Sequence, residues 1–145
     1  MSDSSTCLSV GETAEFTKTI TAADIASFAD ASGDHDPVHT DEDYAKTTAF
    51  GRIIAHGALV MGLLSTTASM MSKRSKERGA QGTPVSVGYD RIRFTYPVFA
   101  GDTLTAHYTI ESIDEAARRT HGKGVITNAE GKTCLVVTHI LAWVS

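Results

Sequence analysis

The segment from Ile53 to Met71 constrains the fold most, because it contains no formally charged residue unless His56 is protonated. It is long enough to cross a bilayer as a helix. Glycines and hydroxyl side chains dilute its apolar character, however, and charged segments of ordinary soluble type flank it, so we expect no membrane span. Residues 57–65 are apolar almost all the way round, which predicts a helix buried on every side at the centre of the core.

The residues before this helix predict one strand and two further helices. Thr13 to Ile20 alternate between the two faces as a strand would. A threonine followed three positions later by an aspartate then signals a capped helix twice, over Thr21–Ala31 and over Thr40–Thr48. Gly33 is expected to end the first of these helices.

Beyond Gly82 the pattern changes to strands. We expect four of them, and the last is apolar on both faces, which places it inside the sheet: Val85–Tyr96, Thr103–Ile113, Gly122–Asn128 and Thr133–Val144. One long buried helix followed by four strands predicts an α+β fold in which an antiparallel sheet curls around the helix. Such a layout leaves a helix flank and a sheet edge open, and dimerisation would bury the remaining apolar surface.

Size, charge and cysteine content limit the classes of function. A chain of 145 residues predicts one domain over residues 1–145. The net charge of -4 provides no broad basic surface for nucleic acid, although Lys73–Arg78 is a local basic cluster that would meet phosphate groups or, alternatively, end a helix in solvent. Cys7 and Cys134 have no metal-type spacing and the start lacks a leader pattern, so we expect a reduced, cytoplasmic protein.

The segment Gly33–His39 carries most of the functional information. Asp34 and His39 are five residues apart, and on a continuous helix their side chains would diverge by roughly 140°. A shared site therefore requires a tight turn, which Pro37 favours because it fixes its own φ and disfavours the helical region for Asp36. An aspartate and a histidine placed in this way can divide proton transfer to and from one water.

Other interpretations of this segment are weaker or simpler. A calcium loop of the EF-hand type beginning at Asp34 would place Ala45 at its twelfth position, where a bidentate glutamate is required, so this interpretation fails. A transition-metal site formed by His35, Asp36 and His39 is an alternative. A surface turn with an exposed histidine is the simplest one.

Three motifs occur in order along the chain: Gly33-Asp34-x-Asp36-Pro37-x-His39, Ala55-His56-Gly57 and Pro97-Val98-Phe99-x-Gly101-Asp102-Thr103-Leu104. With them the chain resembles the MaoC-like dehydratases and, within that family, the (R)-specific enoyl-CoA hydratases. The resemblance implies a hot-dog fold and a homodimer or higher assembly. It also implies reversible addition of water across the trans-2 double bond of an acyl thioester, with no cofactor beyond the coenzyme A of the substrate and no metal.

Position by position, the resemblance assigns Asp34 and His39 to the catalytic pair. Gly57 matches the residue whose backbone N–H receives the thioester oxygen. Ser65 matches a supporting hydroxyl in the active site, although a serine on a buried helix can instead bond back to a carbonyl one turn earlier. Asp36 departs from the family, which usually has asparagine there, and adds a negative charge beside the pair.

The residues themselves supply a candidate for each need of this chemistry. Hydration requires a nucleophilic water at C3, a proton at C2 and stabilisation of an enolate-like oxygen. We expect Asp34 to accept a proton from the attacking water, and His39 to orient that water and to deliver or relay the proton to C2. Gly57 begins a helix, so its N–H lacks a partner within the helix and lies at the positive end of the dipole. His56 either contacts the site or satisfies local backbone groups, and we leave it out of the catalytic set.

Arg91 and Arg93 are possible substrate-binding residues. Two positions apart in a strand, they share one face, which would suit the diphosphate of coenzyme A or simply face solvent. Gly88 is a candidate for a bulge that would change the face on which its neighbours lie.

Several functions compatible with the same fold stay open. A dehydratase acting on acyl carrier protein, or a hydratase of branched or dicarboxylic thioesters, would use the same pair. An acyl-CoA thioesterase would need a carboxylate on or near the buried helix, and residues 57–71 contain none. A non-catalytic acyl-thioester binder would not need an intact Asp34 and His39. The residue that closes the acyl pocket is one of several candidates: Leu59, Met61, Leu63 or Met70.

Overall fold

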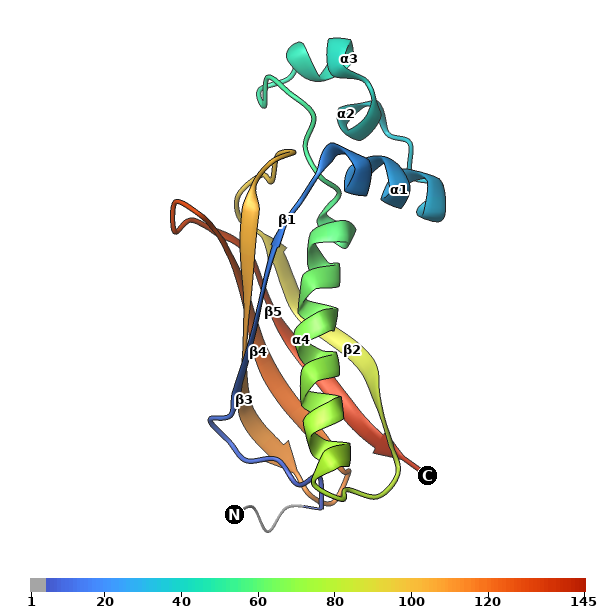
Figure 1. Ribbon diagram of the computed structural model, residues 1–145, viewed down its shortest axis with the longest axis vertical. Helices are drawn as coiled ribbons and strands as arrows, with labels where there is room; N and C mark the ends of the chain where they lie inside the picture. Colours follow the sequence, from blue (N-terminus) through green and yellow to red (C-terminus); the bar gives the residue numbers. More distant parts are fainter. Residues whose placement is uncertain (1–4) are drawn as a thin grey trace.

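The computed structural model describes residues 5–145, which form a five-stranded antiparallel sheet curled around one long helix (Figure 1). The predicted hot-dog architecture is confirmed. The strand order is β1-β3-β4-β5-β2, so β1 and β2 lie at the two edges. The elements follow the chain in this order: β1 (Thr13–Thr19), α1 (Ala22–Ser32), α2 (Pro37–Thr40), α3 (Glu42–Lys46), α4 (Gly57–Glu77), β2 (Thr83–Phe94), β3 (Thr103–Asp114), β4 (Arg119–Asn128) and β5 (Thr133–Val144).

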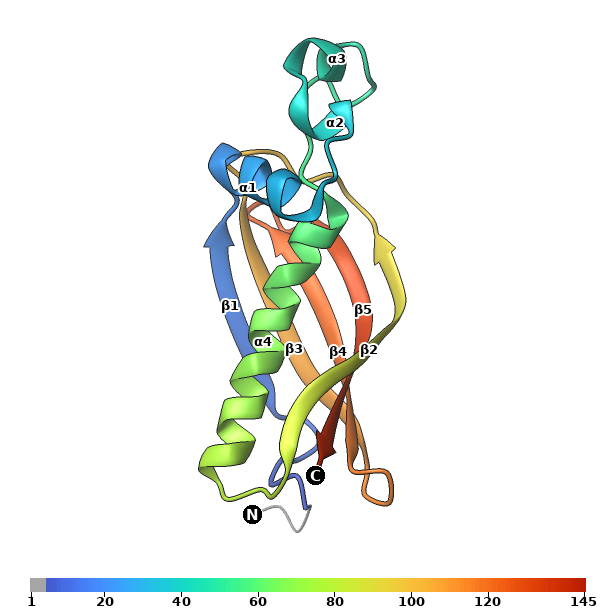
Figure 2. The ribbon, with the colours of Figure 1, turned by 90° about the vertical axis from the view of Figure 1, so that its right-hand side faces the viewer.

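Helix α4 lies in the hollow of the sheet and supplies the centre of the core (Figure 2). Its buried side chains recur at helical spacing: Val60, Leu63, Leu64, Thr67, Ala68, Met71 and Ser75. The prediction of burial on every side is wrong for the single chain, because the small residues Ala58, Gly62, Ser65 and Ser69 lie exposed on the face away from the sheet. The sheet covers one side of the helix only. In the described part of the chain, no helix combines the length and apolar character needed to cross a membrane.

Two glycines of β4 make room for side chains of neighbouring elements, Leu64 of α4 over Gly124 and Tyr108 of β3 over Gly122. A Cβ at Gly124 would lie 2.4 Å from the Leu64 side chain, and one at Gly122 would lie 2.1 Å from the Tyr108 ring. Side chains of neighbouring elements therefore occupy the space that β4 leaves empty. This packing fixes the height of α4 above the sheet and hence the place of its amino end.

The local signals before α4 are partly as predicted. Thr21 and Asp24 form the expected capping box, with their reciprocal hydrogen bonds at 2.9 and 3.0 Å. Gly33 ends α1 in the left-handed region with φ 81°. The predicted short acidic helix is present as α3, but its cap is Asp41 rather than Thr40. The loop before it forms an additional short helix, α2, which Asp36 caps.

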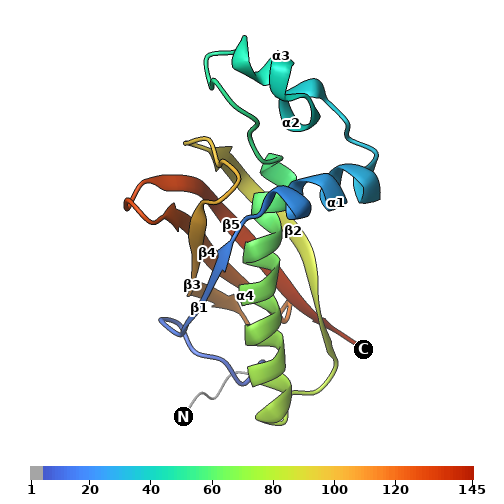
Figure 3. The same cartoon turned by 45° about the horizontal axis from the view of Figure 1, so that its top comes forward.

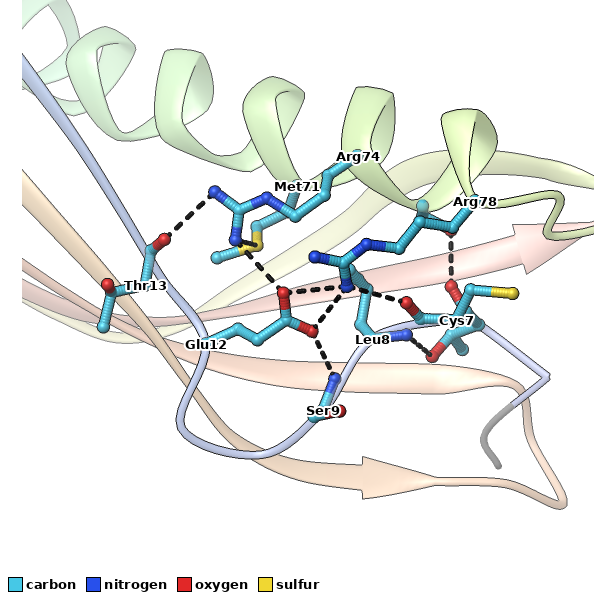
Figure 4. Close-up of polar contacts among 10 residues, drawn as sticks. Cys7, Leu8, Ser9, Glu12, Thr13, Met71, Arg74 and Arg78 are labelled. Carbon is cyan, nitrogen blue, oxygen red and sulfur yellow. Dashed lines mark hydrogen bonds and ion pairs between the residues drawn. The ribbon is translucent and has the colours of Figure 1, made fainter. Parts of the chain in front are cut away.

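The basic cluster at the end of α4 is largely paired within the chain (Figure 4). Glu12 lies 3.2 Å from Arg74 and 2.9 Å from Arg78, and it accepts the Ser9 N–H at 2.6 Å. Burial opposes ionisation of Glu12, but these hydrogen bonds outweigh it and lower the pKa of the carboxyl group. Lys76 donates to two backbone carbonyls at 2.7 and 2.8 Å. The cluster thus ties the segment before β1 to α4.

Candidate active site

The loop between α1 and α2 folds as a series of local side-chain hydrogen bonds. Asp34 accepts the Asp36 N–H at 3.2 Å, and Asp36 in turn accepts the Val38 N–H at 3.1 Å as the cap of α2. Pro37 takes the first helical position, where its missing N–H costs nothing. The carboxylate of Asp36 therefore performs a capping role that asparagine can also fill.

This loop and the start of α4 bring three polar side chains together. A carboxylate oxygen of Asp34, a ring nitrogen of His39 and a ring nitrogen of His56 all lie within 4.8 Å of one another. The sequence had suggested the first two as a pair. His56 was kept out of the predicted set, although an unusual residue at the helix start offered a signal: it is the N-cap of α4 but makes no side-chain capping bond.

The ring of His39 is held in one orientation. Its Nδ1 lies 2.7 Å from the carbonyl oxygen of Ile54, to which an Nδ1–H donates. Ile54 is itself anchored, because its N–H donates to Val38 at 3.2 Å and it bridges to Phe99. The Nε2 of His39 is therefore the nitrogen left for a ligand or a water.

Gly57 begins α4 beside these groups, and its N–H has no partner within the helix. A Cβ at this position would lie 2.6 Å from the ring of Phe94. The ring of Phe94 thus packs directly on the backbone at the helix start, and a larger residue would displace it. Glycine leaves this space to the ring of Phe94, independently of any role for its N–H.

A mainly apolar pocket of about 470 Å³ opens at this end of α4. His39 and Gly57 line it together with side chains from several elements, among them Phe50, Val60, Phe94 and Tyr96. His39 also borders a second cavity of about 250 Å³, which Ile25, His35 and Glu42 help to line. A carboxylate and an imidazole beside a helix start and an apolar hollow can transfer protons on a bound, largely apolar substrate.

Residues 7–132 match the model of the family described as MaoC like domain. The chain belongs to this family. It is 39% identical over 103 residues to the (R)-specific enoyl-CoA hydratase of Rhodospirillum rubrum, covering 71% of this chain and 66% of that protein. It is 30% identical over 114 residues to the 3-hydroxyacyl-thioester dehydratase Z of Mycobacterium tuberculosis, covering 77% of this chain and 72% of that protein. The solved (R)-hydratase of Aeromonas caviae involved in PHA biosynthesis superimposes with a TM-score of 0.80 at 29% identity, covering 94% and 98% of the two chains.

The MaoC-like chain places Ser65 outside the pocket. It lies on the exposed face of α4, two turns beyond Gly57, and does not border either cavity of the single chain. Within residues 5–145 its hydroxyl has no hydrogen-bond partner, so the bond to a carbonyl one turn earlier does not form either. Its role in the site stays a prediction.

Arg91 and Arg93 also lie outside both cavities, exposed on the edge strand β2. The predicted bulge occurs between Ser86 and Gly88, and a second irregularity occurs between Asp90 and Arg93. Arg91 there has φ 55°, which interrupts the simple alternation from which a shared face was predicted. Their contact with a substrate stays a prediction.

None of the four candidates for the end of the acyl pocket lines either cavity of the single chain. Leu63 is buried, and Leu59, Met61 and Met70 pack against the core cluster without lining the pocket. The spacing of apolar residues along α4 does not predict which residues line the pocket, because the pocket walls come from segments far apart in the sequence. Phe50 precedes α4, whereas Phe94 and Tyr96 follow it at the end of β2.

The sequence offers His35, Asp36 and His39 as an alternative metal site, but the described residues assemble a different trio, Asp34, His39 and His56. His35 instead pairs with Asp30 at 3.6 Å. The rings of His39 and His56 are stacked, with centroids 3.9 Å apart and planes inclined by 28°. An imidazole binds a metal ion through a nitrogen lone pair that lies in the plane of the ring. Two stacked rings have separate planes, so these two imidazoles are poorly placed to bind one shared ion.

Proposed function

We propose that this MaoC-like chain is a hydro-lyase that reversibly adds water to a trans-2-enoyl-CoA and forms the (R)-3-hydroxyacyl thioester. The observation that carries this proposal is the convergence of the Asp34 carboxylate with a ring nitrogen of His39 within 4.8 Å, where His39 in turn lines the apolar pocket. The names of the two relatives, a hydratase and a dehydratase of acyl thioesters, describe the two directions of one reaction.

In the proposed reaction, Asp34 accepts a proton from water while the water oxygen forms its bond to C3. His39 orients the same water through Nε2, and the pair returns a proton to C2, so the number of protons on the enzyme is unchanged after one turnover. The Ile54 carbonyl keeps His39 in the tautomer that leaves Nε2 available.

The thioester oxygen gains negative charge as water attacks. We place this oxygen at the Gly57 N–H, where an unpaired donor and the positive end of the α4 dipole both favour it. The apolar pocket would take the acyl chain and exclude bulk water. The proposed chemistry uses no metal and no cofactor apart from the coenzyme A of the substrate.

The test is the loss of absorbance of the enoyl-thioester band when the purified chain is mixed with crotonyl-CoA. The wild-type chain should hydrate it, and His39→Gln should nearly abolish turnover while the circular dichroism spectrum is unchanged. A panel of short, medium, branched and carboxylated enoyl thioesters, on coenzyme A and on acyl carrier protein, then identifies the substrate. Saturable binding without turnover of any of them would favour the non-catalytic binder.

We also propose a homodimer formed through β2. One side of this edge strand has no partner strand within the described chain, and it exposes Val87, while Phe94 is 58% exposed. Strand pairing across a two-fold axis would satisfy the free backbone groups and cover these side chains. Light scattering after size exclusion should give about twice the chain mass of 15.4 kDa.

The two free cysteines suit the reducing cytoplasm, which is the proposed location.

A further inference from the structure

His56 lies between the catalytic loop and the long helix, and it is only 2% exposed. Its Nε2 lies 3.0 Å from the backbone carbonyl oxygen of Asp34, 22 residues away in the sequence. Because a carbonyl only accepts, this nitrogen carries the proton and donates it. The hydrogen bond therefore holds the backbone of the residue whose carboxylate is proposed as the base.

The same ring also supports the other member of the pair. It stacks on His39 with centroids 3.9 Å apart, and Phe28 packs on it at 4.8 Å with an interplanar angle of 55°. The ring of His39 is thus restrained in two ways: Ile54 accepts its Nδ1–H, and His56 covers one of its faces. Rotation of His39 away from the pocket would break both contacts.

The place of His56 in the helix argues against a purely structural reason for it. It is the N-cap of α4, where serine, threonine, aspartate or asparagine usually satisfies a free N–H of the first turn, yet its side chain makes no such bond. A conventional capping side chain would turn toward the second or third N–H of the helix. The ring of His56 instead points back to Asp34, so it supports the loop rather than the helix end.

One polar atom of His56 also has no structural use in the described chain. Its Nδ1 is buried and has no hydrogen-bond partner there. Buried polar atoms in folded proteins are normally paired, and an unpaired one calls for an explanation such as a role in a site. This atom belongs to a ring that contacts both Asp34 and His39.

We infer that His56 is a positioning residue for the hydration reaction, aligning Asp34 through its backbone and His39 through its ring. The inference rests on the proposed function, but it adds a third residue whose two contacts can be removed separately. His56→Phe keeps a flat ring against His39 and loses the donor to Asp34. His56→Gln keeps an N–H donor and loses the stacked ring.

The experiment measures kcat and KM of both variants with crotonyl-CoA, with His107→Gln as the control. His107 is an exposed histidine of β3 that lines neither cavity. Each His56 variant should lower kcat by roughly 10- to 100-fold, because small misplacements of reacting groups cost about this much. KM should stay within about twofold, since an alignment defect acts in the transition state rather than on binding. The control should match the wild-type chain in both constants.

The outcomes separate this inference from the proposed function. A wild-type chain without hydratase activity would overturn the proposed function, and the inference with it. An active wild-type chain whose two His56 variants keep their kcat would overturn the inference alone. If circular dichroism shows that both variants fail to fold, Phe28→Leu loosens the stack and leaves every polar group in place. A folded Phe28→Leu with lower kcat and unchanged KM supports positioning through the ring, whereas unchanged kcat contradicts it.

Discussion

The chain buries two histidines, and their surroundings differ. His139, on β5 inside the sheet, has a partner on each nitrogen: Ser86 lies 2.6 Å from Nε2 and Tyr108 lies 2.8 Å from Nδ1. His56, at the start of α4, has a partner on Nε2 and none on Nδ1 within the described chain. A polar network that is fully satisfied stabilises packing, whereas one with free groups next to a pocket is available for chemistry.

The network around His139 is held in one protonation state by burial. Burial lowers the pKa of His139 to about 4 and raises the pKa of Tyr108 above its ordinary value. The tyrosine hydroxyl therefore stays protonated and can donate to Nδ1, and the neutral ring donates from Nε2 to Ser86. Near neutral pH nothing in this chain of hydrogen bonds titrates, which is the behaviour of a structural element.

The largest effect that the comparison predicts is a loss of catalysis that leaves the stability of the fold almost unchanged. Asp34→Asn removes the proposed base, and turnover of crotonyl-CoA should fall by about 10²–10⁴-fold, the usual contribution of a placed acid or base. Asp34 is exposed, so the denaturation midpoint in urea should hardly change. A folded Asp34→Asn chain with nearly wild-type turnover would contradict the assignment of Asp34.

The second effect concerns pH and stability. His139 is depressed to about pKa 4 from an ordinary value of 6.5, so between these values the unfolded chain binds a proton that the folded chain does not. Above pH 6.5 the ring is neutral in both states and does not reduce the free energy of unfolding. As the pH falls from 6.5 toward 4, protonation of the unfolded chain lowers the free energy of unfolding. The loss approaches about 3 kcal/mol, and no more is lost from this group at lower pH.

Urea denaturation at pH 7, 5.5 and 4.5 measures this dependence. His139→Gln removes the titrating ring, so its free energy of unfolding should vary much less than that of the wild-type chain over this interval. Equal pH dependence in both chains would mean that His139 binds its proton at the same pH in the folded and the unfolded state, which would contradict the lowering of its pKa by burial.

The third effect tests whether the sheet network is structural only. Tyr108→Phe keeps the ring that fills the space over Gly122 and removes the hydroxyl that His139 uses. A buried acceptor then loses its partner, which should cost about 1–3 kcal/mol of stability. Activity per folded molecule should be unchanged. Tyr44→Phe, on the exposed α3, is the matched control and should alter neither quantity.

The sequence predicted those features that depend on neighbouring residues. Apolar residues on both faces of Thr133–Val144 predicted that β5 lies inside the sheet, the Thr21 and Asp24 pair predicted the start of α1, and Pro37 predicted the turn that brings Asp34 near His39. The second capping pair failed because Thr40 lies inside α2, where its hydroxyl donates to the carbonyls of His35 and Asp36, and Asp41 caps the next helix instead. Each of these outcomes was decided within a few residues.

The features that the sequence did not predict depend on contacts between distant segments. His56 joins the site through a carbonyl 22 residues away, and no local pattern encodes that contact. The pocket wall combines Phe50 with Phe94 and Tyr96, which lie on opposite sides of α4 in the sequence. Exposure of one face of α4 was missed because apolar composition alone does not tell on which side the sheet will lie.

The smallest effect concerns the opposite end of α4, where the polar cluster around Glu12 ties the segment before β1 to the helix (Figure 3 shows the two ends). Glu12→Gln removes two ion pairs whose arginine side chains are 33% and 46% exposed, so solvent screens them and the loss of stability should be about 1 kcal/mol or less. The difference from the wild-type chain should shrink further in 1 M NaCl, where the screening length falls to about 3 Å.

Glu77→Gln, whose partner Lys73 lies 3.9 Å away on the exposed helix surface, should have a still smaller effect. Because this end lies far from Gly57 along the helix, turnover should be the same in all three chains. A fall in turnover in Glu12→Gln would show that the two ends of α4 are coupled, contrary to the separation of structural and reactive clusters argued above.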